Sequence, residues 1–155
     1  MTGIIDVKKI DELKSKTKNK KIVLAGGCFD VLHSGHVEFL KKAKGAGDIL
    51  IILLEHDKSV RSKKGKDRPF LNQKLRSKNL SDLKIIDYIV LLPFPVDDAF
   101  YFNLTKLIEP DIIAITKGDP LTDVKKKQVE GVGGKILSVI NRNKKYSSSK
   151  IINKK

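Results

Sequence analysis

The sequence predicts an α/β fold in which a five-stranded parallel sheet carries helices on both of its faces. Three observations lead to this prediction. Short apolar stretches alternate along the chain with stretches whose apolar residues recur every three or four positions, as in helices. Glycine, proline or aspartate stands between many of these segments, as is usual in turns. Strands that alternate with helices form parallel sheets through right-handed crossovers.

The expected strands are short apolar stretches that follow charged or glycine-containing turns. They comprise residues 21–25, 49–54, 88–92, 112–115 and 135–140. The expected helices carry an apolar stripe, as Leu104, Leu107 and Ile108 do in one of them. These helices comprise residues 7–16, 36–44, 73–83, 99–108 and 122–130. Residues 55–69 are polar and contain Gly65, so we expect a loop there.

The length of 155 residues predicts a single domain over residues 1–155, with residues 1–20 as an N-terminal helical extension. Cys28 is the only cysteine, which excludes a disulfide within the chain and fits a reducing compartment. Residues 1–21 have no apolar stretch typical of a signal peptide. The longest apolar run, residues 49–54, is too short to cross a membrane. We therefore expect a cytoplasmic protein that has no membrane partner.

Lysine is abundant, and the formal net charge is +14. One interpretation is a surface that binds nucleic acid, since basic side chains neutralise backbone phosphates. The lysine runs, however, contain no interleaved aromatic residues that would stack on bases, and aromatic residues make up only 6% of the chain. The composition therefore favours a solvated, lysine-rich surface over a nucleic-acid interface.

The segment after the first expected strand is the most informative one. Gly27, Cys28, Phe29 and Asp30 end the strand, and residues 33–36 then read His-Ser-Gly-His at the start of a helix. Glycine permits close approach of a ligand to the backbone. A helix N-terminus attracts anions, and two histidines three residues apart face the same bound group. This combination suits a phosphate chain. A satisfied pair of histidines in an ordinary turn is the alternative interpretation.

Three other loops follow expected strands and carry candidate residues. Lys64 and its neighbours surround Gly65 in a cationic loop that folds over a triphosphate or is simply exposed. Gly118 and Asp119 form a turn that approaches a base, binds a metal or is a plain β-turn. Arg142 precedes a run of serines at positions 147–149, and this run looks like the start of a helix. The serines either hold a phosphate or only cap the helix.

These motifs resemble the HxGH signature of the nucleotidyltransferase (cytidylyltransferase-like) superfamily, whose second signature is an arginine followed by serines or threonines. The resemblance extends over nearly the whole chain to the D-glycero-β-D-manno-heptose 1-phosphate adenylyltransferase domain. It includes residues 27–30, residues 59–69, Arg76, Asp87 and residues 110–111. It implies a Rossmann-like fold that transfers AMP from ATP to a phosphorylated small molecule, such as heptose 1-phosphate, and releases pyrophosphate.

The resemblance implies catalytic roles for His33, His36, Lys64 and Arg76. It implies nucleotide-binding roles for a larger set, which comprises Gly27, Cys28, Phe29, Asp30, Gly35, Lys44, Gly118, Asp119, Arg142, Ser147, Ser148 and Ser149. Asp30 is expected to orient a histidine or a metal ion. The cofactor would be Mg²⁺ or another divalent cation, bridging phosphates with few protein ligands. The metal ligands stay unassigned, and a homodimer is compatible with the resemblance.

Some departures from the pattern leave alternatives open. Residues 117–120 read Lys-Gly-Asp-Pro where the family commonly has Gly-Gly-Asp-Tyr, and three serines stand at 147–149 in place of Ser-Thr-Thr. Glycerol-3-phosphate cytidylyltransferase or FAD synthetase-like activity therefore remains an alternative enzyme function. A basic nucleic-acid-binding module is the alternative outside enzymes. In any of the enzyme readings the substrate phosphate attacks directly, with no covalent enzyme intermediate.

Overall fold

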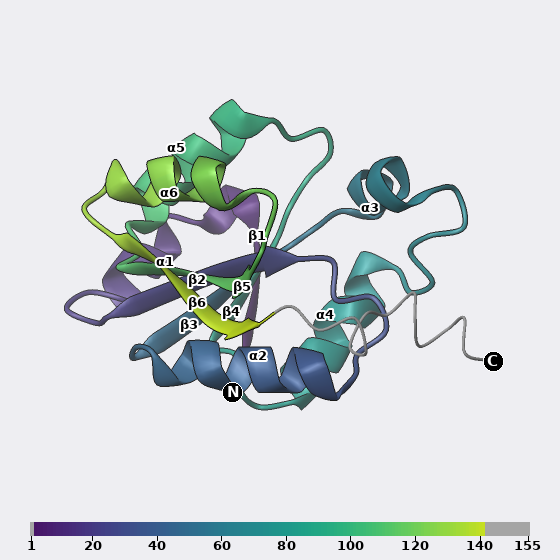
Figure 1. The fold of residues 1–155 in the computed structure, drawn as a ribbon, viewed down its shortest axis with the longest axis horizontal. Coiled ribbons are helices and arrows are strands. Elements are labelled where there is room, and N and C mark those ends of the chain that lie inside the picture. The colour runs from purple at the N-terminus through teal and green to yellow at the C-terminus, as the bar shows by residue number, and fades with distance from the viewer. Residues whose placement is uncertain (1, 142–155) are drawn as a thin grey trace.

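The structure is a computed structural model that describes residues 2–141, and its centre is an all-parallel sheet (Figure 1). The strands of the described residues lie in the order β1-β4-β3-β2-β5-β6. They are β1 (Gly3–Asp6), β2 (Ile22–Gly27), β3 (Ile49–Leu54), β4 (Tyr88–Leu91), β5 (Ile112–Lys117) and β6 (Lys135–Asn141). The prediction of a Rossmann-like α/β fold with a parallel sheet is confirmed.

Helices connect the strands and cover both faces of the sheet (Figure 1). They are α1 (Glu12–Lys16), α2 (Ser34–Gly45), α3 (Asp57–Lys64), α4 (Gln73–Asp82), α5 (Asp98–Ile108) and α6 (Thr122–Glu130), with a short 3₁₀ helix, η1 (Val7–Lys9). Helices α1, α5 and α6 lie on one face, and α2 and α4 lie on the other. Helix α3 stands apart, beyond the ends of the strands, where it can border a ligand site.

The core has two layers because alternate residues of each strand point to opposite faces. In β2, Ile22 and Leu24 face one layer, whereas Val23 and Ala25 face the other. Helix residues complete the layers: Leu13, Leu104, Ile108 and Val129 on the first, and Leu40, Ala43 and Leu80 on the second. Burial of one such leucine contributes about 2 kcal/mol. Both layers are apolar, which explains why the central strands read as unbroken apolar runs.

The sheet has six strands among the described residues, so the predicted count of five was wrong by one. The additional strand, β1, pairs with β4 at the edge of the sheet, from Gly3 opposite Tyr88 to Asp6 opposite Leu91. It has only four residues and a half-exposed Ile4, so its pattern alone is weak. The expected N-terminal helical extension is therefore a strand followed by η1 and α1.

The expected loop over residues 55–69 contains helix α3, which the sequence analysis missed. Its first turn is capped by His56, whose Nδ1 accepts a hydrogen bond from the Lys58 N–H at 3.0 Å. Val60 is buried and anchors the helix to the core. Gly65 ends it with a φ of 106°, a left-handed conformation that favours glycine. The many charged residues of α3 obscured this pattern.

The carboxyl ends of β2 and β5 separate, and this is where the strand order reverses. Strand β2 pairs with β3 along all six residues, but with β5 only at Val23 and Leu24. In parallel α/β sheets, ligands bind at such a reversal, outside the carboxyl ends of the strands. No helix in the described part of the chain is long and apolar enough to cross a membrane.

Candidate active site

The loop that leaves β2 brings the two histidines to the start of α2. Gly27 lies under the ring of Phe29, where an added Cβ would come within 3.0 Å of Phe29 Cε2. Phe29 has a φ of 47°, which is unusual for an aromatic residue, and it is buried. Its ring stands 5.6 Å from that of His36. A strained, tightly packed turn therefore fixes the direction in which α2 begins.

The two histidines are held by reciprocal contacts at the N-terminus of α2. His33 Nδ1 accepts the Gly35 N–H at 3.1 Å, and His36 Nδ1 accepts the His33 N–H at 3.3 Å. The rings stack with their centroids 3.8 Å apart. In neutral imidazole only one nitrogen carries a proton, so both residues have theirs on Nε2. The loop thus presents a pair of Nε2–H donors beside a helix N-terminus, which is suited to phosphate oxygens.

Both histidines are neutral at physiological pH. Burial, together with His33 and the Lys64 ammonium, lowers the pKa of His36 to about 4. Burial also lowers the pKa of His33. A bound anion would oppose these effects, because a negative charge favours the protonated imidazole. The pair is therefore placed to bind an anion and to respond to developing negative charge.

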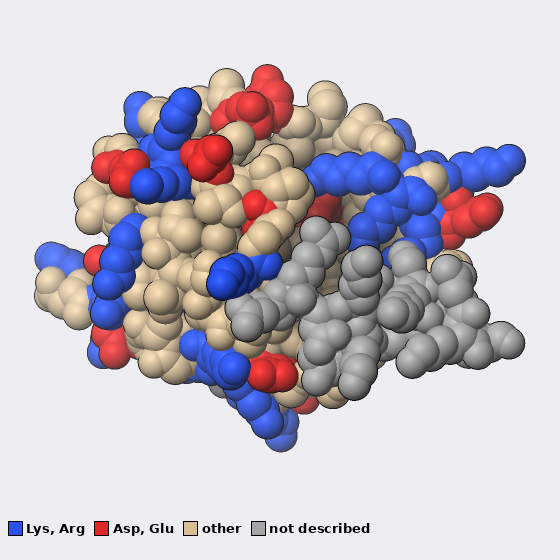
Figure 2. All heavy atoms as spheres, viewed as in Figure 1, with Lys and Arg blue, Asp and Glu red and all other residues tan. Residues whose placement is uncertain are grey.

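Lys64 extends from the end of α3 to the histidine loop. Its Nζ lies 3.2 Å from Cys28 Sγ. Four other cationic residues lie on α3 and just beyond it: Lys58, Arg61, Lys63 and Lys66. Figure 2 shows this end of the molecule densely covered by Lys and Arg side chains. The site therefore opens toward a strongly positive region, which attracts polyanionic ligands.

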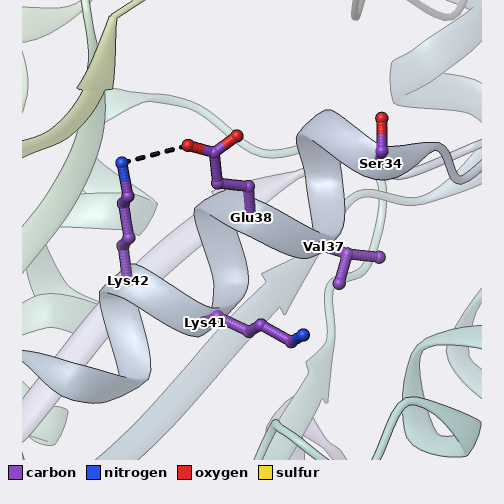
Figure 3. A pocket seen from close by; sticks show the side chains of 5 residues that line it. All are labelled: Ser34, Val37, Glu38, Lys41 and Lys42. Atoms are coloured by element: carbon purple, nitrogen blue, oxygen red, sulfur yellow. Dashed lines mark ion pairs between the residues drawn. The ribbon is translucent and has the colours of Figure 1, made fainter.

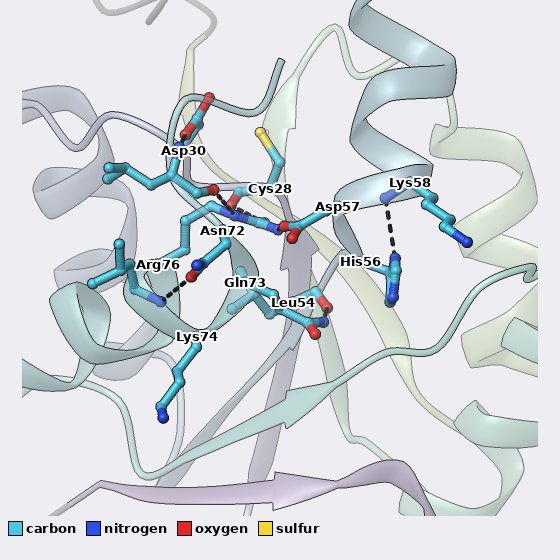
Figure 4. A network of polar contacts seen from close by, with 12 residues as sticks. Cys28, Asp30, Leu54, His56, Asp57, Lys58, Asn72, Gln73, Lys74 and Arg76 are labelled. Carbon is cyan, nitrogen blue, oxygen red and sulfur yellow. Dashed lines mark hydrogen bonds and ion pairs between the residues drawn. The ribbon is translucent and has the colours of Figure 1, made fainter. Parts of the chain in front are cut away.

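Arg76 is engaged by contacts within the protein, and its expected role as a charge clamp stays a prediction. Its side chain is fully buried, with Nη1 donating to the Cys28 carbonyl at 2.8 Å and Nη2 to Asp57 Oδ1 at 2.6 Å (Figure 4). Its Nε donates to the Leu71 carbonyl at 2.9 Å. A guanidinium with five donors in a fixed plane is suited to joining three segments in this way. Arg76 ties the histidine loop to α3 and α4.

Asp30 is engaged by three hydrogen bonds within the protein, and its expected role in orienting a histidine or a metal ion stays a prediction. Its buried carboxylate accepts the N–H groups of Phe70 and Leu71 at 2.8 and 2.9 Å, and Arg68 Nε at 3.0 Å. Burial by itself would raise the pKa of Asp30, but these hydrogen bonds and the Arg68 charge hold it below the usual value. Asp30 therefore fixes the loop before α4 against the histidine loop.

Lys44 lies at the other end of α2 from the histidines, and its predicted nucleotide-binding role stays a prediction. It stands about 15 Å along the helix axis from Ser34, at 1.5 Å per residue. Its Nζ binds Asp87 Oδ2 at 2.6 Å and the Asp48 carbonyl at 2.7 Å. Asp87 Oδ2 also accepts the Leu50 N–H at 2.8 Å. Lys44 thus stabilises the amino ends of β3 and β4.

Gly118 and Asp119 follow β5 across the separation from β2. Gly118 has a φ of 88°, which a side chain would strain. Asp119 accepts the Leu121 N–H at 2.8 Å and pairs with Lys125 at 2.7 Å, which stabilises the turn into α6. The turn therefore lies at the edge of the crevice, but its carboxylate is already engaged within the protein.

The described residues do not fit a resident metal ion. Among residues 2–141, no three His, Cys, Asp or Glu side chains gather as ligands. Acidic residues that follow β2, β3 and β5 each bind a cationic side chain instead: Asp30 with Arg68, Asp57 with Arg76, and Asp119 with Lys125.

Two further features lie apart from this arrangement. Arg142 and the serines at 147–149 fall outside the described residues. A surface hollow of about 580 Å³ is lined by Ser34, Val37, Glu38, Lys41 and Lys42 on the outer side of α2 (Figure 3). A pair formed by Glu38 and Lys42 at 3.0 Å crosses it. The two histidines are not among its lining residues.

Asp57 and Gln73 were not predicted as site residues, although both make contacts around the histidine loop and the strand ends. Gln73 Nε2 donates to the carbonyls of Leu54 and Leu92, both at 3.0 Å, and so joins the carboxyl ends of β3 and β4. The available signal for Asp57 was its place just after an expected strand. Gln73 stands at the start of an expected helix, and this position does not indicate that its side chain joins two strands.

Comparison with known proteins gives a consistent result. A match to the family described as cytidylyltransferase-like covers residues 24–154. The bifunctional protein HldE of Campylobacter curvus is 38% identical over 146 residues, which cover 88% of this chain and 30% of that protein. HldE of Wolinella succinogenes is 44% identical over 98 residues, 63% of this chain and 20% of that protein. The chain spans less than a third of the length of these relatives.

Solved structures resemble the fold. A lipopolysaccharide core biosynthesis protein from Thermoplasma volcanium has a TM-score of 0.67 at 24% identity and covers 81% of this chain and all of its own. Pantoate-β-alanine ligase from Francisella tularensis has a TM-score of 0.65 at 14% identity, over 93% of this chain and 69% of its own. At such identities the likeness concerns the fold alone.

Proposed function

The chain belongs to the cytidylyltransferase-like family of nucleotidyltransferases, and on that premise we propose that it transfers AMP from ATP to a phosphorylated small molecule, releasing pyrophosphate. The acceptor we propose is a sugar 1-phosphate such as heptose 1-phosphate. The observation that carries the proposal is the stacked pair of His33 and His36. It presents two N–H donors at a helix N-terminus, next to the reversal of strand order.

The chemistry needs positioning more than a strong base. The acceptor phosphate is already an anion at neutral pH, and it attacks the α-phosphorus in line with the leaving pyrophosphate. The site must therefore hold two anions together and stabilise the charge that develops between them. His33 and His36 donate to phosphate oxygens, and Lys64 adds a positive charge beside Cys28. Arg76 and Asp30 keep this loop in place from behind.

Residues outside 2–141 enter the proposal through the family resemblance only. Arg142 and the serines at positions 147–149 match the second signature, so we propose that they bind the β- and γ-phosphates. The preference for ATP over CTP also rests on resemblance. Turn 117–120, after β5, borders the crevice and departs from the family pattern, so it is the place to look for base selection.

A substrate panel tests the proposal. ATP, CTP, GTP and UTP are each combined with heptose 1-phosphate, glucose 1-phosphate, glycerol 3-phosphate and FMN, and pyrophosphate release is measured. We expect the highest kcat/KM with ATP and a sugar 1-phosphate. A preference for CTP would keep the family chemistry but overturn the adenylyl assignment. Absence of pyrophosphate release with every pair, together with salt-sensitive RNA binding, would favour the nucleic-acid module.

A further inference from the structure

His56 is the third histidine of the chain and has no role in the nucleotide site described above. It lies two residues beyond the end of β3, and both of its neighbours are tied to the histidine loop. The Glu55 N–H donates to the Gly27 carbonyl at 3.1 Å, and Asp57 is joined to Cys28 through Arg76. Because adjacent Cα atoms are about 3.8 Å apart, His56 lies at the border of the same site.

The hydrogen bonding of His56 defines what its ring offers. Its Nδ1 accepts the Lys58 N–H at 3.0 Å, so in the neutral form the proton is on Nε2. In Figure 4 the ring extends from the start of α3, away from the helix. His56 is half-buried, so its donor is positioned by the protein yet reachable from solvent. A fixed N–H donor of this kind can select a hydroxyl or phosphate oxygen.

Phe94 stands beside His56, in the loop that follows β4. Gln73 joins the Leu54 and Leu92 carbonyls, so the chains that leave β3 and β4 start side by side. Two residues beyond those carbonyls, the rings of His56 and Phe94 lie 6.0 Å apart, tilted by 33°. Phe94 is 43% exposed, although large aromatic side chains are usually covered. A flat apolar ring beside a polar donor suits a ligand with one apolar face and several hydroxyls.

Glu55 precedes His56 in the chain, and Tyr101 lies close enough to Glu55 to be influenced by its charge. The Glu55 carboxylate pairs with Lys63 at 2.8 Å and is mostly buried. Burial and the nearby Glu55 charge raise the pKa of Tyr101 to about 12, so its hydroxyl stays protonated. The segment that carries His56 therefore also carries a carboxylate, with a protonated hydroxyl near that carboxylate. Such a mixture can satisfy both the donors and the acceptors of a polyhydroxylated ligand.

We infer that His56 and Phe94 select the acceptor substrate. The Phe94 ring packs against the carbon face of a sugar ring, and His56 Nε2–H donates to an oxygen of the same sugar phosphate. This inference rests on the proposed transfer and assigns its acceptor side to the ends of β3 and β4, with the nucleotide between β2 and β5. A three-carbon acceptor would cover little of the Phe94 ring, so the pair favours sugar phosphates over glycerol 3-phosphate.

The first test separates the imidazole from its role as a helix cap. His56→Ser and His56→Asn both retain a side-chain cap for α3, since these residues are strong N-caps. We expect KM for the sugar 1-phosphate to rise about tenfold, the effect of one lost hydrogen bond, while KM for ATP changes less than threefold. An unchanged acceptor KM in both variants, or an equal rise for ATP, would overturn the assignment.

The second test concerns the aromatic ring. Phe94→Ala should reduce the preference for a sugar 1-phosphate over glycerol 3-phosphate at least fivefold. Leu107→Ala removes a similarly exposed apolar side chain from α5 and should leave this preference unchanged. Equal preference in wild type and Phe94→Ala would contradict a role for the ring.

A binding measurement keeps this inference distinct from the transferase proposal. Glucose 1-phosphate and heptose 1-phosphate are titrated calorimetrically into wild type and His56→Ser, each saturated with a non-hydrolysable ATP analogue. If wild type binds a sugar phosphate and His56→Ser binds it about tenfold more weakly, the subsite stands even where no turnover occurs. If wild type binds neither ligand, or both proteins bind equally, the inference fails.

Discussion

Arg76 and Asp57 form an ion pair at 2.6 Å in which the arginine side chain is fully buried and the aspartate is 31% exposed. The same guanidinium also holds the Cys28 carbonyl. One side chain thus joins the loop that carries the two histidines to the helix that carries Lys64. The relative position of histidines and lysine, and with it the shape of the site, depends on this buried contact.

Replacement of Arg76 should therefore affect stability as well as activity. Arg76→Met leaves Asp57 and the Cys28 carbonyl without their partner, and we expect a loss of about 3 kcal/mol in the free energy of unfolding. Urea denaturation measures this loss. Lys78→Met is a matched control, because the Lys78–Asp82 pair is mostly exposed and should contribute less than about 0.5 kcal/mol. Similar losses in both variants would contradict the role of Arg76.

His36 should make stability depend on pH. Burial keeps it neutral to a pH of about 4, whereas in the unfolded chain it protonates near 6.5. Between these values the unfolded state binds more protons, so the free energy of unfolding decreases as the pH falls. Above pH 6.5 His36 is neutral in both the folded and the unfolded state, so it no longer lowers the free energy of unfolding. His36→Asn should reduce the difference in stability between pH 6.5 and 4 by about 3 kcal/mol. Urea midpoints for both proteins across this range measure it, and parallel curves would refute the assignment.

His36→Ala should also slow the proposed reaction. Loss of one donor to the transition state reduces kcat about 100–1000-fold, with a smaller effect on nucleotide affinity. Pyrophosphate release gives kcat, and titration of a non-hydrolysable ATP analogue gives the affinity. A folded variant with wild-type turnover would show that this imidazole is not part of the reaction.

Lys64 and Lys44 provide a direct comparison of two lysines. Lys64 lies beside Cys28, whereas Lys44 is bound to Asp87 at the opposite end of α2. Lys64→Met should lower kcat/KM for ATP about tenfold or more through loss of a charged contact. Lys44→Met should change it less than twofold. A large kinetic effect of Lys44→Met with unchanged melting temperature would reverse this assignment.

Much of the fold followed from the sequence because its signals are local. The apolar residues of β2 and β3 and the stripe of α5 are visible in a window of a few residues. Strand β1 was missed because Ile4 and Ile5 are its only apolar residues and its partner β4 is far along the chain. Helix α3 was missed because its single buried apolar residue, Val60, stands among charges.

The site was predicted less completely, since its contacts join distant segments. The histidine motif is contiguous and was recognised. What Lys44 and Arg76 bind depends instead on how α2 and α4 pack against the sheet. This packing brings Asp87 close to Lys44 and Asp57 close to Arg76. Asp30 illustrates the same point: its partners Phe70 and Leu71 are adjacent to it only in space. Residue type and spacing do not encode such contacts.

The early separation of β2 from β5 has a consequence for how this protein can evolve. The strands pair at Val23 and Leu24, yet β2 runs on to Gly27 and β5 to Lys117. Along this stretch the backbone amides and carbonyls between the two strands face the crevice rather than a neighbouring strand, and buried backbone groups need a partner. A ligand held by peptide groups is insensitive to side-chain substitution. Two chains with very different side chains around such a crevice can therefore bind the same ligand. Conversely, two similar chains can bind different ligands if the backbone shifts.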